Sequence, residues 1–376
     1  MRSVGDIQRL DRPGGAGPDQ PGLPERPESP QEAQRRQWAE RLQQFTDHPA
    51  ESQRELRERT HALPPGHPSS TWDDKGNPRP PVPRLSDIEL PEPPLSDADY
   101  ADHIAKVESA LDKARANGLA TEKQFTIDPN HEIWSDERSA IHEQIIDEVY
   151  AAAGAVPCGK EAILAGGLGG AGKTTVLERH VNIDRSNYLT INPDDFKEQL
   201  AFRGLAPRIP GLSPMEASPL VHEESSYLAR QLALRAMADG KNIIWDITMS
   251  SITSTGRRVE ELKAAGYSRI DGVFVDIPVE VSVTRTEERH RRGHDLYLAG
   301  QGLGGRYLPA SVVRAQHDSE YGSLNRRTFE MLKDEMNDWV VFDNSSDGRP
   351  PSVLAESRNG VLARNEVLRP EAKLHD

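Results

Sequence analysis

The sequence predicts an α/β protein in which helices cover both faces of a parallel sheet. Three observations predict this class. From about residue 130 to residue 345, short apolar segments typical of buried strands alternate with longer segments typical of helices. The first of these strands is followed at once by a glycine-rich stretch and then by a helical pattern. Before residue 100 this pattern is absent. Of the 29 prolines, 17 lie there, and proline interrupts both helices and strands.

The proline-rich region, residues 1–98, is expected to be largely disordered. A stretch such as PRPPVPRLSDIELPEPPL has too few apolar residues to offset the entropy lost on ordering. One segment, PQEAQRRQWAERLQQF (30–45), places Trp38, Leu42 and Phe45 on one helical face. This segment is interpreted either as a transient polar helix or as a helix that binds a partner.

After this region, we expect a helical lead-in at 99–130, with a short amphipathic helix at 99–118. The main domain is placed at 131–345 and a C-terminal tail at 346–376. The domain begins with a helix at 135–154, which Ser135 caps. The predicted strands are 162–167, 188–192, 242–248, 270–277 and 339–344. The predicted helical stretches between them are near 173–182, 214–239, 255–265, 279–292 and 310–337.

The overall composition bounds the cellular setting and the partners. The formal net charge of −14 argues against general nucleic-acid binding, because phosphate backbones repel an acidic surface. The mean hydropathy is −0.68, and no apolar run is long enough to span a membrane. The N-terminal residues lack the apolar core of a secretory signal. Cys158 is the single cysteine, which fits a reducing, cytoplasmic setting.

The strongest local signal is a phosphate-binding loop, GLGGAGKT (167–174), which matches G-x-x-x-x-G-K-[ST]. Glycines let backbone N–H groups point at phosphate oxygens, and the following helix adds its positive end. Lys173 is expected to reach the β- and γ-phosphates of ATP, and Thr174 to offer its hydroxyl to Mg²⁺. The expected nucleotide-binding residues are Gly167, Leu168, Gly169, Gly170, Ala171, Gly172, Lys173, Thr174 and Thr175.

Two carboxylates follow strands and are expected at the ligand-binding edge of the sheet. Asp194, in INPDDF, is interpreted as the base that accepts the proton of an attacking hydroxyl. The alternative is that Asp194 and Asp195 only cap a helix that begins near Phe196. Asp246 ends NIIWDIT and is expected to hold Mg²⁺ through water or to orient the substrate, or else to serve a turn. Thr248 is a further candidate for the same site.

An arginine-rich stretch, 285–309, is expected to supply positive charge for phosphate transfer. Arg285, Arg289 and Arg292 would align on one helical face, and a glycine-rich segment with Arg306 follows. This layout suggests a mobile lid that closes over the nucleotide. The alternative is a solvated helix face.

Together these residues resemble the zeta toxin family of P-loop kinases. The resemblance covers residues 135–345. It is carried by GLGGAGKTT, NPDDFK, HEESSYLARQL, NIIWDIT, the arginines of RTEERHRRG, and GRYLP. It implies a P-loop kinase-type parallel sheet, with Lys173 and Thr174 on ATP and Mg²⁺ and Asp194, rather than Asp195, as the base. It also implies that Arg289 and Arg306 contact the transferring phosphate. His222 and Ser225 are then candidate substrate contacts or, alternatively, residues of a helix surface.

The resemblance further implies a small-molecule hydroxyl acceptor, a sugar nucleotide such as UDP-N-acetylglucosamine, and a possible antitoxin partner protein. Two alternatives stay open at this point. The first is a kinase for another small molecule, such as a dinucleotide, nucleoside or antibiotic. The second is a nucleotide-binding switch, although the N-K-x-D motif of guanine-specific switches is missing from the sequence.

Overall fold

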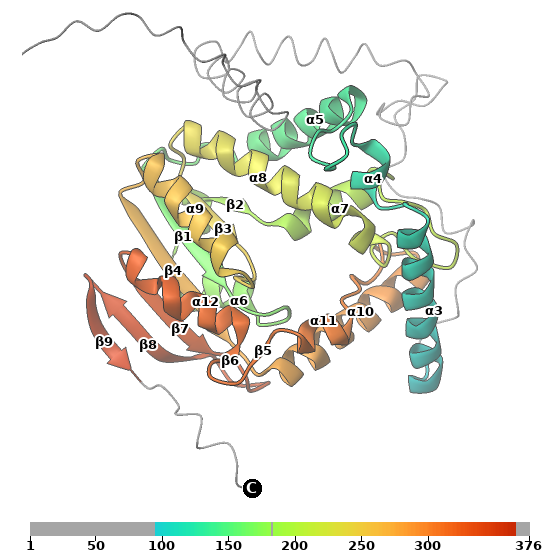
Figure 1. Ribbon diagram of the computed structural model, residues 1–376. Helices are drawn as coiled ribbons and strands as arrows, with labels where there is room; N and C mark the ends of the chain where they lie inside the picture. The colour runs from blue at the N-terminus through green and yellow to red at the C-terminus, as the bar shows by residue number, and fades with distance from the viewer. Residues whose placement is uncertain (1–94, 182, 366–376) are drawn as a thin grey trace, which may run out of the picture.

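The computed structural model describes residues 95–181 and 183–365 (Figure 1). The predicted disordered region 1–98 and its candidate helix 30–45 lie outside these residues, apart from 95–98. Those four residues already lead into a helix, α3, which begins at Asp97. None of the helices in the described part of the chain has the length and apolar character needed to cross a bilayer.

The centre of the molecule is a seven-stranded sheet in the order β2-β3-β1-β4-β7-β8-β9. The five strands from β2 to β7 run parallel, and β8 and β9 continue the sheet in the antiparallel sense. The parallel sheet predicted from the sequence is therefore confirmed. The strands are β1 (Glu161–Gly166), β2 (Leu189–Ile191), β3 (Ile243–Asp246), β4 (Arg269–Asp276), β7 (Trp339–Asp343), β8 (Ser352–Arg358) and β9 (Val361–Asn365).

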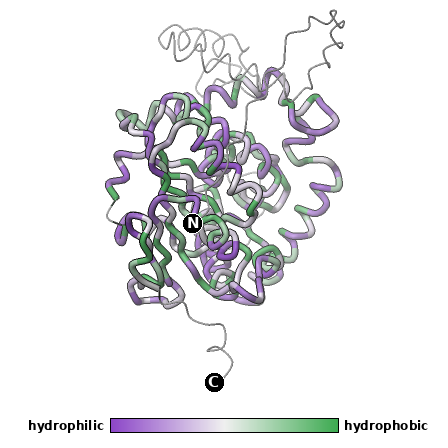
Figure 2. Tube along the Cα trace, turned by 60° about the vertical axis from the view of Figure 1, so that its left-hand side comes forward, coloured by the Kyte–Doolittle hydropathy of each residue, from purple (hydrophilic) through white to green (hydrophobic). Residues whose placement is uncertain are grey.

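Helices cover both faces of the sheet because successive strand residues point to opposite sides. In β1, Ala162 and Leu164 join one hydrophobic cluster, whereas Ile163 and Ala165 join the other. The first face is packed against α5 (Asp136–Ala152), α7 (Pro193–Phe202), α8 (His222–Ala238), α9 (Ile252–Ala264) and α12 (Leu324–Leu332). The second face is packed against α6 (Lys173–Arg179), α10 (Val279–Leu298) and α11 (Ala310–Arg314). Figure 2 shows hydrophobic and hydrophilic residues alternating along the outer helices, as one-sided packing requires.

The lead-in helix α3 (Asp97–Ala116) packs against the domain rather than standing apart from it (Figure 1). Its buried residues Val107 and Leu111 form a third hydrophobic cluster with Leu212, Leu220 and Tyr307. Ser96 caps the helix by accepting a hydrogen bond from the N–H of Asp99. A short helix, α4 (Thr121–Phe125), follows before α5.

Three sequence predictions need correction. The predicted tail 346–376 begins with the paired strands β8 and β9, and residues 366–376 lie outside the described part. The predicted helical stretch 310–337 is divided into α11, a small hairpin of β5 (His317–Asp318) and β6 (Gly322–Ser323), α12, and a 3₁₀ turn, η4 (Lys333–Glu335). Helix α7 begins at Pro193, three residues before the predicted start. Two further 3₁₀ turns are η2 (Arg185–Asn187) and η3 (Ser218–Val221).

Candidate active site

The glycine-rich loop lies between β1 and α6, where the sequence places it (Figure 1). Gly167 has φ 140° and Gly172 has φ 84°, which are conformations that residues with a side chain rarely adopt. A Cβ atom at Gly167 would also lie 2.4 Å from the carbonyl oxygen of Val275. These two glycines are therefore required by backbone conformation, and at Gly167 by space as well.

Side chains from other elements hold the carbonyl oxygens of this loop. Ser282 Oγ donates to the carbonyl of Gly169 (2.7 Å), and Asn344 Nδ2 donates to that of Ala171 (2.8 Å). Within the described residues, the N–H groups of Gly169 and Gly170 have no hydrogen-bond partner. The loop thus has donors available for an anion. Sequence reasoning missed Ser282 and Asn344, because no motif marks either residue.

Lys173 and Asp246 lie together beside the loop. Lys173 Nζ is 3.3 Å from the carbonyl oxygen of Gly167 and 3.6 Å from Asp246 Oδ1. Asp246 ends β3, and its Oδ2 accepts a hydrogen bond from Asn192 Nδ2 (3.4 Å). Burial raises the pKa of Asp246, and Asp194 adds to this rise, whereas Lys173 opposes it. Thr174 and Thr175 are exposed in the first turn of α6.

Asp194 lies in the first turn of α7, but the helix does not use its side chain as a cap. The N-cap is Asn192, whose Oδ1 accepts a hydrogen bond from the N–H of Asp194 (2.9 Å). The Asp194 carboxylate instead forms ion pairs with Lys197 Nζ (3.1 Å) and with Arg306. Its environment therefore supports a role in ligand chemistry more than a role in capping.

The electrostatics separate Asp194 from its neighbour. Burial raises the pKa of Asp194, but Lys197, Arg306 and Arg289 lower it by more, so the net pKa is below the usual value. Burial, Glu198 and Asp246 raise the pKa of Asp195 to about 6. Asp194 is therefore the carboxylate that stays ionised over the wider pH range.

The two arginines of the predicted catalytic set lie near this carboxylate. Arg306 NH1 pairs with Asp194 and its NH2 with Glu198 Oε1 (3.0 Å). Arg289, from α10, has a buried Nε without a hydrogen-bond partner in the described part of the chain. Burial and nearby Arg306 lower the pKa of Arg289, while Asp194 opposes this shift. Arg289 is thus held near Asp194 with hydrogen-bonding capacity to spare.

Comparison with known proteins identifies the family. A family model described as zeta toxin matches residues 157–347, just over half of the chain. The chain belongs to the zeta toxin family. No match was found among curated proteins.

One solved structure supports the fold of this zeta toxin family member, and two others are more distantly similar. A crystal structure of AvrRxo1-ORF1 with AvrRxo1-ORF2 and sulphate ions is 18% identical and covers 68% of this chain and 84% of its own, with a TM-score of 0.51. A second crystal structure of these two proteins, with ATP, is 16% identical over 68% of this chain and 84% of its own, with a TM-score of 0.49. A structure from the PezAT toxin–antitoxin system of Streptococcus pneumoniae is 16% identical and covers 59% and 82% of the two chains, with a TM-score of 0.43. Family and fold together support an ATP-dependent phosphotransferase.

In this zeta toxin family member, the arginines of the arginine-rich stretch lie in two places: Arg289 and Arg306 near Asp194, and Arg285 against the phosphate loop. Arg285 does not join Arg289; it pairs with Asp347 (2.6 Å) and contacts the carbonyl of Gly170 (3.4 Å), so it braces the phosphate loop. Of the glycines that follow, Gly304 and Gly305 are closely packed, whereas a Cβ at Gly302 would meet no atom within 4 Å. A Cβ at Gly305 would lie 2.0 Å from the carbonyl oxygen of His290 on α10. These contacts do not support the freely mobile lid expected from the sequence.

The remaining predicted substrate contacts, His222, Thr248 and Ser225, differ in their exposure and in their neighbours. His222 lies at the start of α8, and its pKa is lowered by desolvation and by the nearby charge of Lys197, while Asp194 opposes the shift. Thr248 is exposed just beyond β3, and its Oγ1 bonds to Ser250 Oγ (3.2 Å). Ser225 is fully buried, and its hydroxyl donates to the carbonyl of His222 (2.8 Å). We therefore do not retain Ser225 as a substrate contact.

Proposed function

We propose that this protein transfers the γ-phosphate of ATP to a hydroxyl group of a sugar nucleotide, UDP-N-acetylglucosamine in particular. The observation that carries the proposal is the placement of one ionised carboxylate, Asp194, among the basic groups of the site. Arg306 pairs with it directly, and the charges of Arg289 and Asp246 act on it. Lys173 extends from the phosphate loop to Asp246, so the loop and the carboxylate belong to one continuous charged site.

The roles follow from the charge of each group. The loop N–H groups and Lys173 bind the phosphates of ATP. Asp194 accepts the proton of the acceptor hydroxyl, and the oxygen of that hydroxyl forms a bond to the γ-phosphorus. The bond between the γ-phosphorus and the oxygen of the β-phosphate breaks, which releases ADP. Arg289 and Arg306 stabilise the negative charge that spreads over the transferring group. Most of the rate enhancement then comes from positioning and electrostatics.

The residues present also fit Mg²⁺. The Thr174 hydroxyl is exposed beside the loop, and Asp246 ends the neighbouring strand, so both offer the oxygen ligands that Mg²⁺ prefers. When bound, Mg²⁺ would neutralise charge on the phosphates. The rise in the pKa of Asp246 is offset in part by Lys173, whose Nζ lies 3.6 Å from this carboxylate.

Membership of the zeta toxin family supports the choice of acceptor and a further partner. We propose that a small antitoxin protein binds this chain, as the toxin–antitoxin setting of PezAT suggests. The identity of the acceptor is the more specific part of the proposal, and a panel of candidate acceptors tests it.

The test is incubation of the full chain with ATP, Mg²⁺ and single candidate acceptors, followed by mass spectrometry for the gain of one phosphate. The panel holds sugar nucleotides, nucleosides, dinucleotides and aminoglycosides. Phosphorylated UDP-N-acetylglucosamine is expected with the wild type and not with Asp194→Asn. Phosphorylation of a different acceptor alone would overturn the sugar-nucleotide assignment and keep the kinase. ATP hydrolysis that no acceptor accelerates would favour a nucleotide switch.

A further inference from the structure

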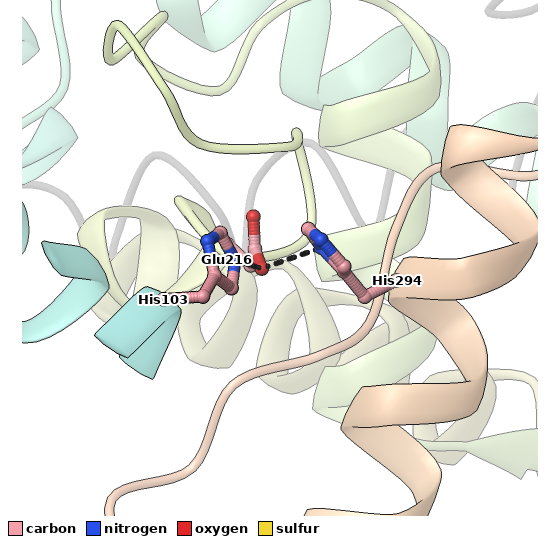
Figure 3. A group of neighbouring side chains, drawn as sticks. All are labelled: His103, Glu216 and His294. Carbon is pink, nitrogen blue, oxygen red and sulfur yellow. Dashed lines mark hydrogen bonds and ion pairs between the residues drawn. The ribbon is translucent and has the colours of Figure 1, made fainter. Parts of the chain in front are cut away.

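A second cluster of ionisable side chains is built from elements other than the phosphate loop. It joins His103 of α3, Glu216 of the segment before η3, and His294 of α10 (Figure 3). His290, one turn earlier on α10, lies against the same carboxylate. All four side chains are buried, with relative exposures of 4%, 0%, 0% and 1% for His103, Glu216, His294 and His290.

The geometry converges on one oxygen atom. Glu216 Oε1 lies 2.7 Å from His103 Nε2, 3.0 Å from His294 Nδ1 and 3.1 Å from His290 Nε2. The other carboxylate oxygen, Oε2, accepts a hydrogen bond from the N–H of Ser213 (2.7 Å). One potential ligand atom each from His103, Glu216 and His294 lies within 4.8 Å of the other two. Figure 3 shows both imidazole rings flanking the carboxylate.

Hydrogen bonds to Glu216 account for His103 and His290, but not for His294. Within the described residues, neither ring nitrogen of His294 has a hydrogen-bond partner, although the residue is fully buried. Its Nδ1 has the distance of an ion pair to Glu216 but not the direction of a good hydrogen bond. Buried polar groups are almost always satisfied, and leaving one unpaired costs about 1–3 kcal/mol. An unpaired imidazole beside a carboxylate points to a missing ligand.

The charge balance leads to the same conclusion. The Glu216 carboxyl group is fully buried, and its hydrogen-bonding side chains are the imidazoles of His103 and His290. A buried anion needs a positive partner, and no lysine or arginine forms an ion pair with Glu216 among the described residues. A divalent cation bound to imidazole nitrogens would supply that charge.

We propose that His103, Glu216 and His294 bind one divalent transition-metal ion of the zinc class. Imidazole nitrogen and carboxylate oxygen are the donors that zinc accepts in proteins. Tetrahedral bonds of about 2.0–2.1 Å place ligand atoms about 3.3 Å apart. The observed separations of 2.7 and 3.0 Å therefore need only a small outward shift. The N–H of Ser213 holds the second carboxylate oxygen, Oε2, as the supporting residues of metal sites do, and His290 Nε2 lies 3.1 Å from Oε1 itself.

The bound ion would connect three separate parts of the chain. It would join α3 and the segment before η3 to α10, the helix that carries Arg289 next to His290. This site is distinct from the Mg²⁺ and ATP groups and does not rest on the proposed reaction. Its predicted effect is on the stability and alignment of α10 with α3.

The test uses the full chain, purified without a polyhistidine tag, stripped with a chelator and titrated with Zn²⁺ or Co²⁺ in the absence of nucleotide. One equivalent of either metal is expected to bind, with the visible absorption bands of tetrahedral Co²⁺. His103→Gln and His294→Gln are each expected to weaken binding by about 100-fold. His142→Gln is the matched control, because His142 is also buried 2.7 Å from a glutamate, Glu224, but an arginine takes the place of the second histidine.

Failure to bind a stoichiometric metal, or equal binding by both variants and the wild type, would overturn the proposal. Circular dichroism confirms that each variant is folded. If neither variant folds, X-ray absorption at the zinc edge of the wild-type protein still decides the matter. Two or more imidazole ligands would support the site, and a zinc ion without imidazole ligands would exclude it.

Discussion

Replacing Asp195 by asparagine tests which carboxylate in the first turn of α7 receives the proton during transfer. Asp194 and Asp195 are adjacent, but their surroundings shift their pKa values in opposite directions. Lys197, Arg306 and Arg289 together bring the pKa of Asp194 below its usual value despite its burial. Burial, Glu198 and Asp246 raise that of Asp195 to about 6. If Asp194 is the base, Asp195→Asn is expected to retain substantial activity.

The magnitude follows from the fraction of each group that is ionised. A base is active when it is deprotonated, so activity falls as the pH drops through its pKa. A carboxyl group with a pKa of about 6 is about nine-tenths ionised at pH 7 and about one-tenth ionised at pH 5, which predicts roughly a tenfold loss of kcat/KM if Asp195 is the base. The pKa of Asp194 is instead lowered by Lys197, Arg306 and Arg289 despite its burial. We therefore expect the Asp194-dependent step to lose much less of its rate between these pH values.

The assay is kcat/KM from pH 5 to pH 8, with product counted after quenching, because the pKa values of the free enzyme govern kcat/KM. Wild type and Asp195→Asn are compared at each pH, so protonation of ATP affects both equally. Parallel profiles would support Asp194. An inactive Asp195→Asn that still binds ATP, together with a tenfold wild-type loss at pH 5, would refute the assignment and make Asp195 the base.

Four substitutions test the remaining parts of the site and its support. Lys173→Ala is expected to weaken ATP binding and abolish transfer, whereas Asp194→Asn is expected to abolish transfer with near-normal ATP binding. Calorimetric titration with ATP separates the two variants. Equally weak ATP binding by both would contradict these roles. Arg306→Ala is expected to lower kcat by about 10²–10³ without affecting unfolding, because it removes charge stabilisation; an unchanged kcat would place Arg306 outside the reaction. Glu224→Gln is expected to lower the free energy of unfolding by about 3–5 kcal/mol in urea, because it leaves Arg138 buried without its anion. Since the pKa of Glu224 is lowered to about 2, its contribution is present at neutral pH and is lost as the pH falls through about 2; a urea midpoint like that of the wild type would contradict this.

The parts predicted well from sequence are those with short-range signals. The loop at 167–174 has a fixed spacing and a strand and helix on either side, so its position follows from local chemistry. The parallel strands are mostly apolar, because both of their faces are buried. Asp194 and Asp246 were found because both follow such strands.

The parts that sequence reasoning missed depend on distant partners. Strand β8 is partly exposed and is formed by pairing with β7, and β9 in turn pairs with β8. No sequence motif marks Asn344, yet its side chain donates a hydrogen bond to the carbonyl of Ala171, which is 173 residues away. Ser225 is a candidate substrate contact through the resemblance to the zeta toxin family, but tertiary packing buries its side chain completely. His103 and Glu216 are 113 residues apart, so no local spacing could connect them.

The docking of α3 sets a lower limit on the size of an independently folding unit. The family match begins at residue 157, but Val107 and Leu111 cover Leu220 from well before that point. Burial of each such side chain stabilises a protein by about 1.5–3 kcal/mol, against a typical total stability of 5–15 kcal/mol. A chain trimmed to the matched segment would therefore expose a hydrophobic surface to water and would tend to aggregate, even with every residue of the phosphate loop intact.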